Sequence, residues 1–502
     1  MKKCESIPSR KLLWLLPPAQ KNCQNPKTGL SIGLLRSVRS ELDLSLSTLE
    51  VDPANTDLAG HVANVFNKVL NEQLSEKLLP DREFLVENNT IQVGRYIPFS
   101  IDSELSRMTQ PNGLVNSTAV SHTAGGPLSF DPEASYIVTG GFGGLGKAIC
   151  SWMAERCARF ISAISRYAGR SAEDKLFIAE MKSIGCVLTP VAGPVQDFKL
   201  VKSAVIQSPK LVKGVIHLAM ALGDALFPEM TNEGWKESLA PKVDGAWNLH
   251  NALKDESLDF FVVTSSIVST ITVPDQANFN AANTFLEAFC QYRNGLGPAA
   301  SAIAISPIDD IGVVVGNEKA RRNLRSNGLQ FLTEREVLEY IHLGILHRAP
   351  TPIIMGLHSD THLDDAANHV AWKKDRRMGL YHNTAKEESA NDDSGEGDSF
   401  REFIADAIVS PSKVDAPESA AFLALELGKC VYTFMLKPVE EVDISLILVD
   451  VGLDSLMAVE LRRLWNQMFS TTISVLEIMS LGALENFGKL AAKGLKQRLL
   501  EG

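Results

Sequence analysis

The stretch "SYIVTGGFGGLGKAICSWMAERC", residues 135–157, decides the fold. A short apolar strand leads directly into a glycine-rich turn, and a helical pattern follows the turn. Thr139, Gly140, Gly144 and Gly146 fit a TGxxxGxG spacing. Glycine tolerates positive φ, and the free N–H groups at a helix start favour an anionic group such as a pyrophosphate. The stretch therefore predicts a nucleotide-binding strand–turn–helix unit.

Seven short apolar segments recur from residue 135 onward, and helical stretches separate them. They are "SYIVTGG", "RFISAIS", "VLTPVAG", "GVIHLAM", "DFFVVTSS", "SAIAISPI" and "PTPIIMGL". Short apolar strands that alternate with helices predict a parallel sheet covered on both faces. We therefore expect an α/β fold with a doubly wound, Rossmann-type sheet. It either binds a nucleotide at the glycine turn or has kept the turn and lost the ligand.

Arg166 lies at the carboxyl end of the second of these segments, in "AISRYAGR". Ligands of such sheets bind outside the carboxyl ends of the strands. An acid at this place suits the ribose hydroxyls of NAD, whereas an arginine suits the 2′-phosphate of NADP. Arg166 is therefore a candidate for NADPH binding, and an ordinary surface arginine is the alternative.

The composition excludes several classes of protein. The net charge is −11, so nucleic acid is not an expected partner. No apolar run approaches the ~20 residues of a membrane span, and "LLWLL" near the N-terminus is too short for a signal peptide and predicts a buried strand. The seven cysteines form no CxxC pair and the ten histidines no HExxH pattern, so we expect no metal site and a reducing, cytoplasmic location.

Two changes in composition divide the chain. "NTAKEESANDDSGEGDS", residues 383–399, has six acids, one lysine and no large apolar residue, which is typical of a flexible linker. A second, less sharp break at residues 109–135 is rich in Ser, Thr, Gly and Pro and lacks periodicity. The predicted parts are residues 1–108, a linker at 109–134, an α/β domain at 135–382, an acidic linker at 383–400, and a helical domain at 401–502. In the first part, "DREFLVENNTIQVGRYIPF" predicts a hairpin that turns at Asn88–Asn89.

Six ordered motifs resemble those of ketoreductase domains of modular and iterative polyketide synthases, which have the short-chain dehydrogenase/reductase fold. They are "TGGFGGLG", "ISR", "GVIHLAMALGDALFPEMT", "PKVDGAWNLH", "FFVVTSSIVS" and "QANFNAANTFLEAF". Residues 1–108 resemble the non-catalytic structural half that precedes such domains in reducing fungal polyketide synthases. The resemblance runs from about Lys11 to His358. It implies an NADPH-dependent reductase fold that acts on carrier-bound β-ketoacyl thioesters.

The resemblance also implies a catalytic set, and one member is missing. In the family a Ser and a Tyr hydrogen-bond the ketone oxygen, the Tyr supplies a proton, and a Lys and an Asn complete the tetrad. The matching positions are Lys242 in "PKVDG", Ser266 in "TSS" and Asn283 in "NAAN", but the tyrosine position is Phe279. A phenyl ring cannot protonate an alkoxide, so we expect impaired reduction.

A second departure follows the third strand of the α/β domain. The family usually has an Asp-Val pair there, whose acid contacts adenine. This chain has "AGPVQD", with Pro194 at the position of the acid. Asp197 substitutes for it only if the loop is rearranged. Two departures at one site favour a domain that has lost part of its chemistry.

The last hundred residues contain "LVDVGLDSLMAVELRRLWNQM", which predicts a helix that begins near Ser455. A helix cap is the alternative explanation of Ser455, and a helical-bundle core explains the apolar stripe. That stripe comprises Met457, Leu461, Leu464, Trp465 and Met468, with Arg462 and Arg463 off it. "GLDSL" resembles acyl and peptidyl carrier domains, whose serine receives 4′-phosphopantetheine from a phosphopantetheinyl transferase. The resemblance implies this attachment at Ser455.

Three functional hypotheses follow. The chain is a ketoreductase–carrier didomain that reduces β-ketoacyl thioesters, or a carrier module whose reductase fold serves as a scaffold. A terminal thioester reductase is disfavoured because its carrier normally comes first. No condensing, acyl-transferase or dehydratase motif is present, and the gap at about residues 100–134 is too short for an enoyl reductase. We therefore expect that the chain either works with a partner polyketide synthase that supplies the missing domains or is the C-terminal remnant of a larger synthase.

Overall fold

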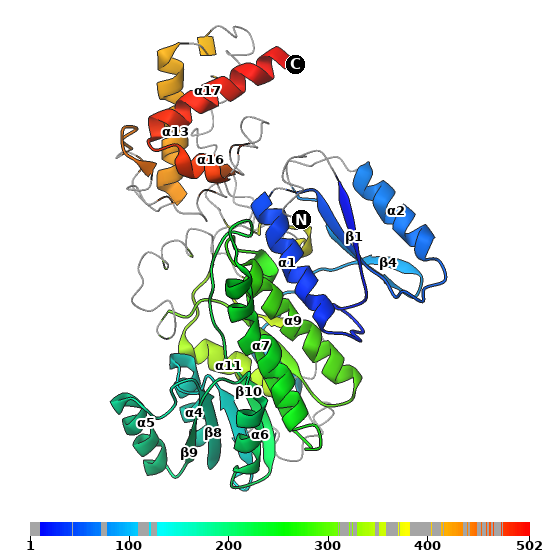
Figure 1. Cartoon of the computed structure of the whole chain (residues 1–502), viewed down its shortest axis with the longest axis vertical. Helices are drawn as coiled ribbons and strands as arrows, with labels where there is room; N and C mark the ends of the chain where they lie inside the picture. Colours follow the sequence, from blue (N-terminus) through cyan, green and yellow to red (C-terminus); the bar gives the residue numbers. More distant parts are fainter. Residues whose placement is uncertain are drawn as a thin grey trace.

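The computed structural model of the 502-residue chain describes most of the α/β part and less of the C-terminal part. The described ranges are residues 11–42, 44–71, 78–108, 120–121, 128–309, 329–346, 351–357, 372–381, 413–414, 416–434, 442–448, 461–462 and 475–501, with single residues at 311, 321, 324, 370, 403, 439, 453, 458, 465 and 473. Two sheets lie side by side, and a helical unit sits at one end of the molecule (Figure 1).

The first sheet has the order β1-β2-β3-β4. Its strands are Leu12–Leu16 (β1), Leu46–Glu50 (β2), Glu83–Glu87 (β3) and Thr90–Val93 (β4), and its helices are Lys27–Leu42 (α1) and Leu58–Leu70 (α2). The first three strands are parallel, and β4 pairs antiparallel with β3. The predicted hairpin is confirmed, because Asn88 and Asn89 connect β3 to β4 with φ of 48° and 58°. Two successive left-handed residues suit the twist of a two-residue hairpin.

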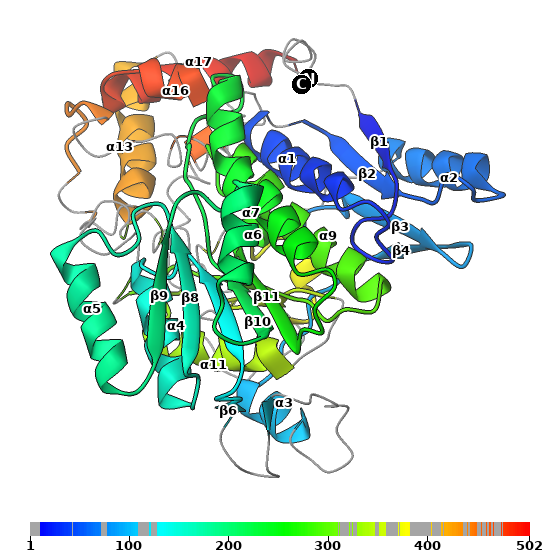
Figure 2. The same cartoon turned by 60° about the horizontal axis from the view of Figure 1, so that its bottom comes forward.

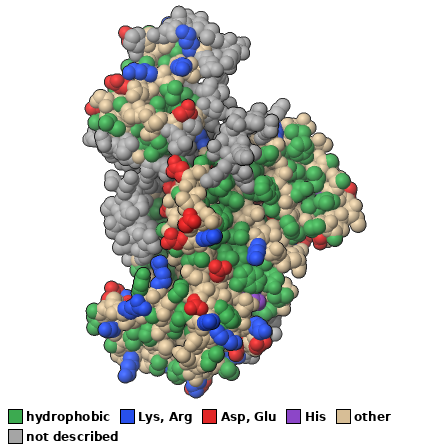
Figure 3. All heavy atoms as spheres, in the orientation of Figure 1, with side chains coloured by type: hydrophobic (Ala, Val, Ile, Leu, Met, Phe, Trp, Pro, Cys, Tyr) green, Lys and Arg blue, Asp and Glu red, His purple; other side chains and the backbone are tan. Residues whose placement is uncertain are grey.

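The prediction that "LLWLL" forms a buried strand is wrong in one respect. The strand β1 forms, but Trp14 is 40% exposed and Leu15 is 46% exposed. The reason is that β1 is an edge strand that pairs only with β2, so only Leu16 is buried. In Figure 3, hydrophobic side chains gather over the part of the molecule that contains the first sheet, on the right of the view.

The second sheet is the predicted doubly wound parallel sheet. Its seven strands are Ser135–Thr139 (β7), Phe160–Ser165 (β8), Val187–Ala192 (β9), Val212–His217 (β10), Phe260–Ser266 (β11), Ser301–Ile305 (β12) and Ile353–Ile354 (β13). The order is β13-β12-β11-β10-β7-β8-β9, and every pairing is parallel. The chain moves outward in one direction through β7–β9 and in the other through β10–β13. The switch point between β7 and β10 is where such sheets bind ligands.

Helices cover both faces of this sheet, as Figures 1 and 2 show. One face carries Gly144–Glu155 (α4), Ala172–Ser183 (α5) and Glu334–Leu346 (α11), whose Ile149, Met181 and Ile341 share a core. The other carries Phe198–Ile206 (α6), Asn232–Ala252 (α7) and Ala277–Gly295 (α9), whose Val201, Leu249 and Phe285 share a second core. Short additional elements are Ile101–Met108 (α3), Val120–Ser121 (β5), Ser129–Phe130 (β6), Val268–Ile271 (α8) and Arg376–Met378 (η1).

The two sheets are joined through a close helix pair, α1 and α9. A Cβ added at Gly33 of α1 would lie 2.2 Å from the carbonyl oxygen of Asn280, so only glycine permits this approach. The hydroxyl of Thr284 donates to the carbonyl oxygen of Gly29 at 2.7 Å and accepts from the N–H of Gly33 at 3.1 Å. The N-terminal part of the chain, residues 1–108, therefore fixes the position of α9, the helix that carries Phe279 and Asn283.

The C-terminal unit contains Pro417–Phe434 (α13), Val475–Ser480 (α16) and Leu484–Glu501 (α17). The helix that the sequence predicts near Ser455 lies between α13 and α16 in the chain and is described only at residues 458, 461–462 and 465. Leu461 and Trp465 are buried, as the apolar stripe predicts, and Trp465 stacks on Phe487 with ring centroids 5.4 Å apart. Met457, Leu464, Met468 and Ser455 lie outside the described residues. Within the part of the chain that the structure describes, no helix is long and apolar enough to cross a membrane.

Candidate functional site

A cleft of about 1040 Å³ follows the carboxyl edge of the second sheet at the switch point. The glycine turn, Arg166 and the catalytic-face residues Lys242, Ser266 and Phe279 all line it. The cleft therefore unites the predicted nucleotide site with the predicted catalytic face. Among the described residues, no cluster of three or more potential metal ligands is found.

The glycine turn has the geometry that its spacing predicts. Gly140 has φ of +72°, a left-handed conformation, and α4 begins at Gly144. A Cβ at Gly146 would lie 2.2 Å from the carbonyl oxygen of Gly140, so the turn and the first helical turn pack without side chains between them. The free N–H groups at the start of α4 border the cleft, which fits a pyrophosphate.

Thr139 lies beneath this turn and does not line the cleft. Its buried hydroxyl is 2.6 Å from Nδ1 of His217 and accepts from the N–H groups of Leu218 and Ala219 at 3.2 and 3.3 Å. The residue ties the end of β7 to the segment after β10 and so supports the turn from below. His217, 1% exposed, is an interior histidine, as its apolar strand suggests.

Arg166 is exposed and lines the cleft directly after the last residue of β8. Its neighbour Ser165 supports the turn, because its hydroxyl accepts from the N–H of Phe142 at 3.2 Å. A guanidinium at this rim, beside the start of α4, fits the 2′-phosphate of NADPH in charge and position.

The loop after β9 does not restore the missing acid. Gly193, Val195 and Gln196 line the cleft, whereas Asp197 caps α6. The Asp197 carboxylate accepts from the N–H groups of Lys199 and Leu200 at 2.9 and 3.4 Å. Because this carboxylate is engaged at the helix start, Asp197 does not take the place of the acid that Pro194 replaces.

Lys242 and Phe279 lie close together in the cleft. The Lys242 Nζ donates to the carbonyl oxygen of Thr264 at 2.7 Å and lies 5.3 Å from the centroid of the Phe279 ring. Phe279 is 6% exposed and packs in a cluster that includes Ile271 and Trp372. The ring therefore occupies the wall of the cleft beside the lysine and presents no hydroxyl there.

Asn283 lies one helical turn after Phe279, fully buried in α9. Neither atom of its side-chain amide has a hydrogen-bond partner among the described residues. A buried amide without a partner is costly unless water or a ligand satisfies it. This unsatisfied group fits a site built for a hydrogen-bonded network that includes more than protein atoms.

Ser266 ends β11 and is held mainly through its backbone. Its hydroxyl makes only long contacts, 3.5 Å to the carbonyl oxygen of Ile305 and 3.5 Å from the N–H of Val268. Its carbonyl oxygen accepts from the hydroxyl of Ser269 at 2.7 Å. The hydroxyl is therefore free to turn toward a ligand in the cleft while the backbone stays fixed.

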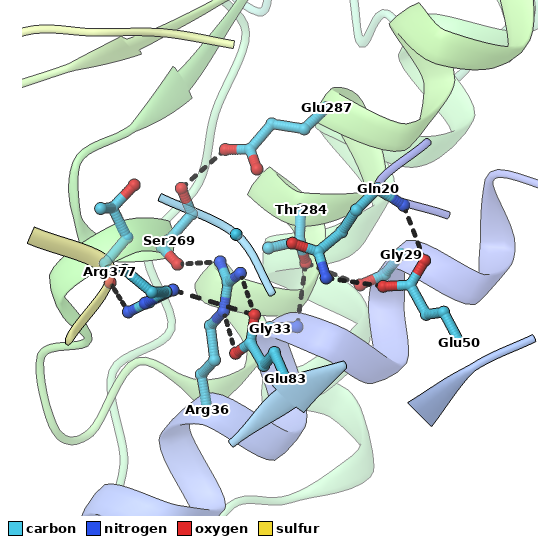
Figure 4. Close-up of polar contacts among 12 residues, drawn as sticks. Gln20, Gly29, Gly33, Arg36, Glu50, Glu83, Ser269, Thr284, Glu287 and Arg377 are labelled. Atoms are coloured by element: carbon cyan, nitrogen blue, oxygen red, sulfur yellow. Dashed lines mark hydrogen bonds and ion pairs between the residues drawn. The ribbon is translucent and has the colours of Figure 1, made fainter. Parts of the chain in front are cut away.

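A buried network behind Ser266 was not predicted from the sequence. The hydroxyl of Ser265 donates to Oε1 of Glu287 at 2.6 Å, and the hydroxyl of Ser269 shares its one hydrogen between this oxygen, also at 2.6 Å, and the carbonyl oxygen of Ser266. Burial raises the pKa of the Glu287 carboxyl. The guanidinium of Arg36 donates to the carbonyl oxygen of Ser269 at 2.5 Å and to both carboxylate oxygens of Glu83 at 2.8 and 2.6 Å (Figure 4). The N-terminal part of the chain, residues 1–108, thus directly supports the segment that contains Ser265, Ser266 and Ser269. The sequence held one signal of this network: Glu287 lies two helical turns after Phe279, on the same face of the helix.

Charge holds this network together. Burial by itself would raise the pKa of Glu83, but the positive charge of Arg36, with that of Arg377 and Arg39, overrides it and holds the pKa well below its usual range. Removal of one partner from such a buried set typically costs about 3–5 kcal/mol. The contact between residues 1–108 and the domain of the second sheet is therefore held by specific charge pairs as well as by close packing.

Burial lowers the pKa of Lys242 to about 7, although the charge of Glu287 opposes the shift. The ammonium loses water in the fold and gains no carboxylate contact. Near neutral pH the group is therefore divided between its charged and neutral forms.

Replacing Lys242 with methionine is expected to stabilise the protein near pH 7. The folded pKa of about 7 lies below the ordinary 10.5, so the unfolded chain binds the extra proton between these values and stability falls as pH drops from 10.5 to 7. Methionine removes this penalty, which is roughly 2–4 kcal/mol after loss of the hydrogen bond to Thr264. Urea unfolding at pH 7 and pH 10 checks it: the gain shrinks at pH 10. The same change at the exposed Lys236 of α7 is the control, and an equal gain there contradicts the explanation.

Comparison with known families identifies two domains. The family described as "KR domain" matches residues 134–310, and "Phosphopantetheine attachment site" matches residues 433–490. The chain therefore combines a ketoreductase domain with a phosphopantetheine attachment domain. A KR domain implies NADPH, and an attachment site implies 4′-phosphopantetheine on a serine.

Curated relatives agree with this reading of the domains. The chain is 39% identical over 379 residues to "Highly reducing polyketide synthase gloL" of Glarea lozoyensis, which covers 74% of this chain and 15% of that protein. It is 31% identical over 478 residues to "Highly reducing polyketide synthase ALT1" of Alternaria alternata, which covers 93% of this chain and 18% of that protein. The chain therefore spans less than a fifth of the length of these relatives.

Solved structures support the fold. "Structure of A-type Ketoreductases from Modular Polyketide Synthase" has a TM-score of 0.58 at 19% identity and covers 70% of this chain and 69% of that one. "Crystal structure of a ketoreductase domain from the bacillaene assembly line" has a TM-score of 0.57 at 22% identity and covers 70% and 79%. At these identities the likeness concerns the fold alone.

Proposed function

We propose that this chain carries acyl groups on Ser455 for a reducing polyketide synthase, and that its ketoreductase domain binds NADPH but reduces β-ketoacyl thioesters slowly. The observation that carries the second part is the Phe279 ring beside Lys242 in a cleft that the glycine turn, Arg166 and Ser266 also line. The "GLDSL" motif inside the matched carrier range carries the first part.

The residues of the cleft divide the work of binding and chemistry. The glycine turn and Arg166 would hold the pyrophosphate and the 2′-phosphate of NADPH, which supplies hydride to the ketone carbon when bound. Ser266 has a free hydroxyl that donates to the ketone oxygen. Phe279 offers no proton to the oxygen as it becomes an alkoxide, so water must provide it. General acid catalysis of this kind is worth about 10²–10⁴ in rate.

The carrier half depends on partners. A phosphopantetheinyl transferase is needed to modify Ser455, and condensing and acyl-transferase domains are needed to load and extend the acyl chain. The division into residues 1–108, 109–134, 135–382, 383–400 and 401–502 is part of this proposal, and the two matched ranges support it. A cytoplasmic location, expected from the scattered cysteines, is also part of it.

The second candidate function is a carrier and scaffold without any reductase activity. It is favoured by two separate departures from the family pattern, Phe279 at the proton donor and Pro194 in the loop after β9, whose neighbours Gly193 and Val195 line the cleft. Both candidates assign acyl attachment to Ser455, and they differ only in whether the ketoreductase domain reduces a thioester.

One experiment with the unaltered protein tests the proposal. The carrier is loaded with a 3-oxobutyryl-phosphopantetheine group, NADPH is added, and the thioester is analysed by mass spectrometry over time. We expect the 3-oxo form to persist far beyond the time of a typical turnover of about 10 s⁻¹, while NADPH binds in a fluorescence titration. Rapid conversion to the 3-hydroxy form contradicts slow reduction, and an absence of NADPH binding favours the scaffold.

A further inference from the structure

The C-terminal unit contacts the N-terminal part of the chain, residues 1–108, through one buried arginine. Both terminal guanidinium nitrogens of Arg462 donate to backbone carbonyl oxygens, those of Ser40 and Glu41, in the last turn of α1. Arg462 is only 5% exposed. The last carbonyls of a helix lack partners within the helix and carry its negative dipole end, so they suit a cation with several fixed donors.

Arg462 reaches this contact because it lies off the apolar stripe of its own helix. The neighbouring Leu461 is fully buried in the core of the C-terminal unit, whereas the arginine reaches another part of the chain. The arginine lies seven residues after Ser455, about two helical turns along the predicted helix. The anchor therefore belongs to the same predicted helix as the modification site.

A second contact is apolar. Leu226, in the segment between β10 and α7, packs against the core of the C-terminal unit. This segment borders the cleft, because Leu222 and Asp224 line it. The carrier therefore touches the reductase half at the rim of the candidate active site.

The side chain of Glu41 links these two contacts. Its carboxylate accepts from the N–H of Phe227 at 2.6 Å and from the N–H of Asp275 at 3.0 Å. The N–H of Ala225 in turn donates to the carbonyl oxygen of Asp275 at 2.7 Å. Burial raises the pKa of Glu41 to about 7, and its two backbone hydrogen bonds and the charge of Arg462 act against that rise.

The joined segments are the two sides of the cleft rim. Asp275 lines the cleft and precedes α9, which begins at Ala277 and carries Phe279. A single residue, Glu41, therefore receives the carrier on its backbone and fastens the rim with its side chain.

We propose that Ser40, Glu41 and Leu226 form a docking site for the carrier domain of this same chain, with Arg462 as the anchor, and that docking fastens the rim of the cleft. The inference goes beyond the proposed function. It requires neither modification of Ser455 nor reduction of a ketone, so a failure of either leaves it standing.

Hydrogen–deuterium exchange on the full chain tests the proposal. In Arg462→Ala the amides of residues 225–227, 229–230 and 275 are expected to exchange about ten-fold faster or more, because rim opening becomes easier. Lys489→Ala removes the same charge from an exposed site on α17 and is the control. The amides of β10 and α17 are expected to keep their protection in both variants, which excludes unfolding of either domain.

A second variant keeps the test decisive if Arg462→Ala unfolds the carrier. Leu226→Ser changes the reductase side alone, and it is expected to increase the radius of gyration in small-angle X-ray scattering as the carrier is released. Unchanged exchange in Arg462→Ala together with an unchanged radius in Leu226→Ser overturns the proposal. Wild-type protection of the rim that grows with protein concentration also overturns it, because the occupant is then the carrier of a second copy.

Discussion

Phe279→Tyr is expected to raise the rate of NADPH-dependent reduction of a β-keto thioester by about 100-fold or more. The new hydroxyl is added to a ring that lines the same cleft as Lys242 and Ser266. The centroid of this ring lies 5.3 Å from Lys242 Nζ, and Asn283 lies one helical turn further along α9. NADPH oxidation followed at 340 nm with a simple β-keto thioester measures the change. The roles of the phenol as acid and as oxyanion donor overlap, so the two gains do not multiply.

The double variant Phe279→Tyr/Lys242→Met is the control for the chemistry. A charged Lys242 would lower the pKa of the new phenol, and methionine cannot. We expect most of the gain to be lost in the double variant, whereas Phe279→Leu gives none. An equally active wild type, or a gain that survives the loss of Lys242, contradicts the account of the site. Because Pro194 remains, the Michaelis constant for NADPH is expected to stay high while turnover rises.

The parts of the fold that depend on local pattern were predictable from the sequence. All seven strands of the second sheet coincide with apolar segments, and the glycine turn has the predicted conformation at Gly140. The hairpin at Asn88–Asn89 followed from turn residues between two apolar arms. These signals lie within short windows, where the period of the side chains fixes the element.

The misjudged and missing features depend on contacts between distant segments. The exposure of Trp14 follows from the edge position of β1, which no five-residue pattern reveals. The pairing of Arg36 with Glu83 and with the backbone of Ser269 joins positions 47 and 233 residues away. The role of Arg462 depends on where α1 ends in space. In each case the residue type was visible and its partner was not.

The structural half thereby gains a function in the site. It holds α9 through Gly33 and Thr284, and it holds the Ser266 segment through Arg36 and Ser269. These contacts keep Ser266 and Asn283 in place although the tyrosine is absent. An intact support around a substituted proton donor explains why one reversion is expected to restore chemistry.

Ser455→Ala is expected to abolish modification by a phosphopantetheinyl transferase completely. Transfer from coenzyme A breaks its pyrophosphate and joins the phosphate of phosphopantetheine to the serine Oγ, and alanine has no oxygen to form that bond. Intact-protein mass spectrometry should show one added phosphopantetheine group on the wild type and none on the variant. Ser480→Ala, which alters an exposed serine of α16 in the same domain, is the control and should be modified fully.

The alternative role of Ser455 as a helix cap is separable from its role as an attachment site. Loss of a capping oxygen costs about 1 kcal/mol, and aspartate caps as well as serine does. Ser455→Asp is therefore expected to keep the stability of the wild type in urea unfolding while accepting no group. A wild type that remains unmodified under conditions where a known carrier is modified contradicts the attachment site. In that case the serine serves only the helix, and the C-terminal unit is a bundle that happens to carry "GLDSL".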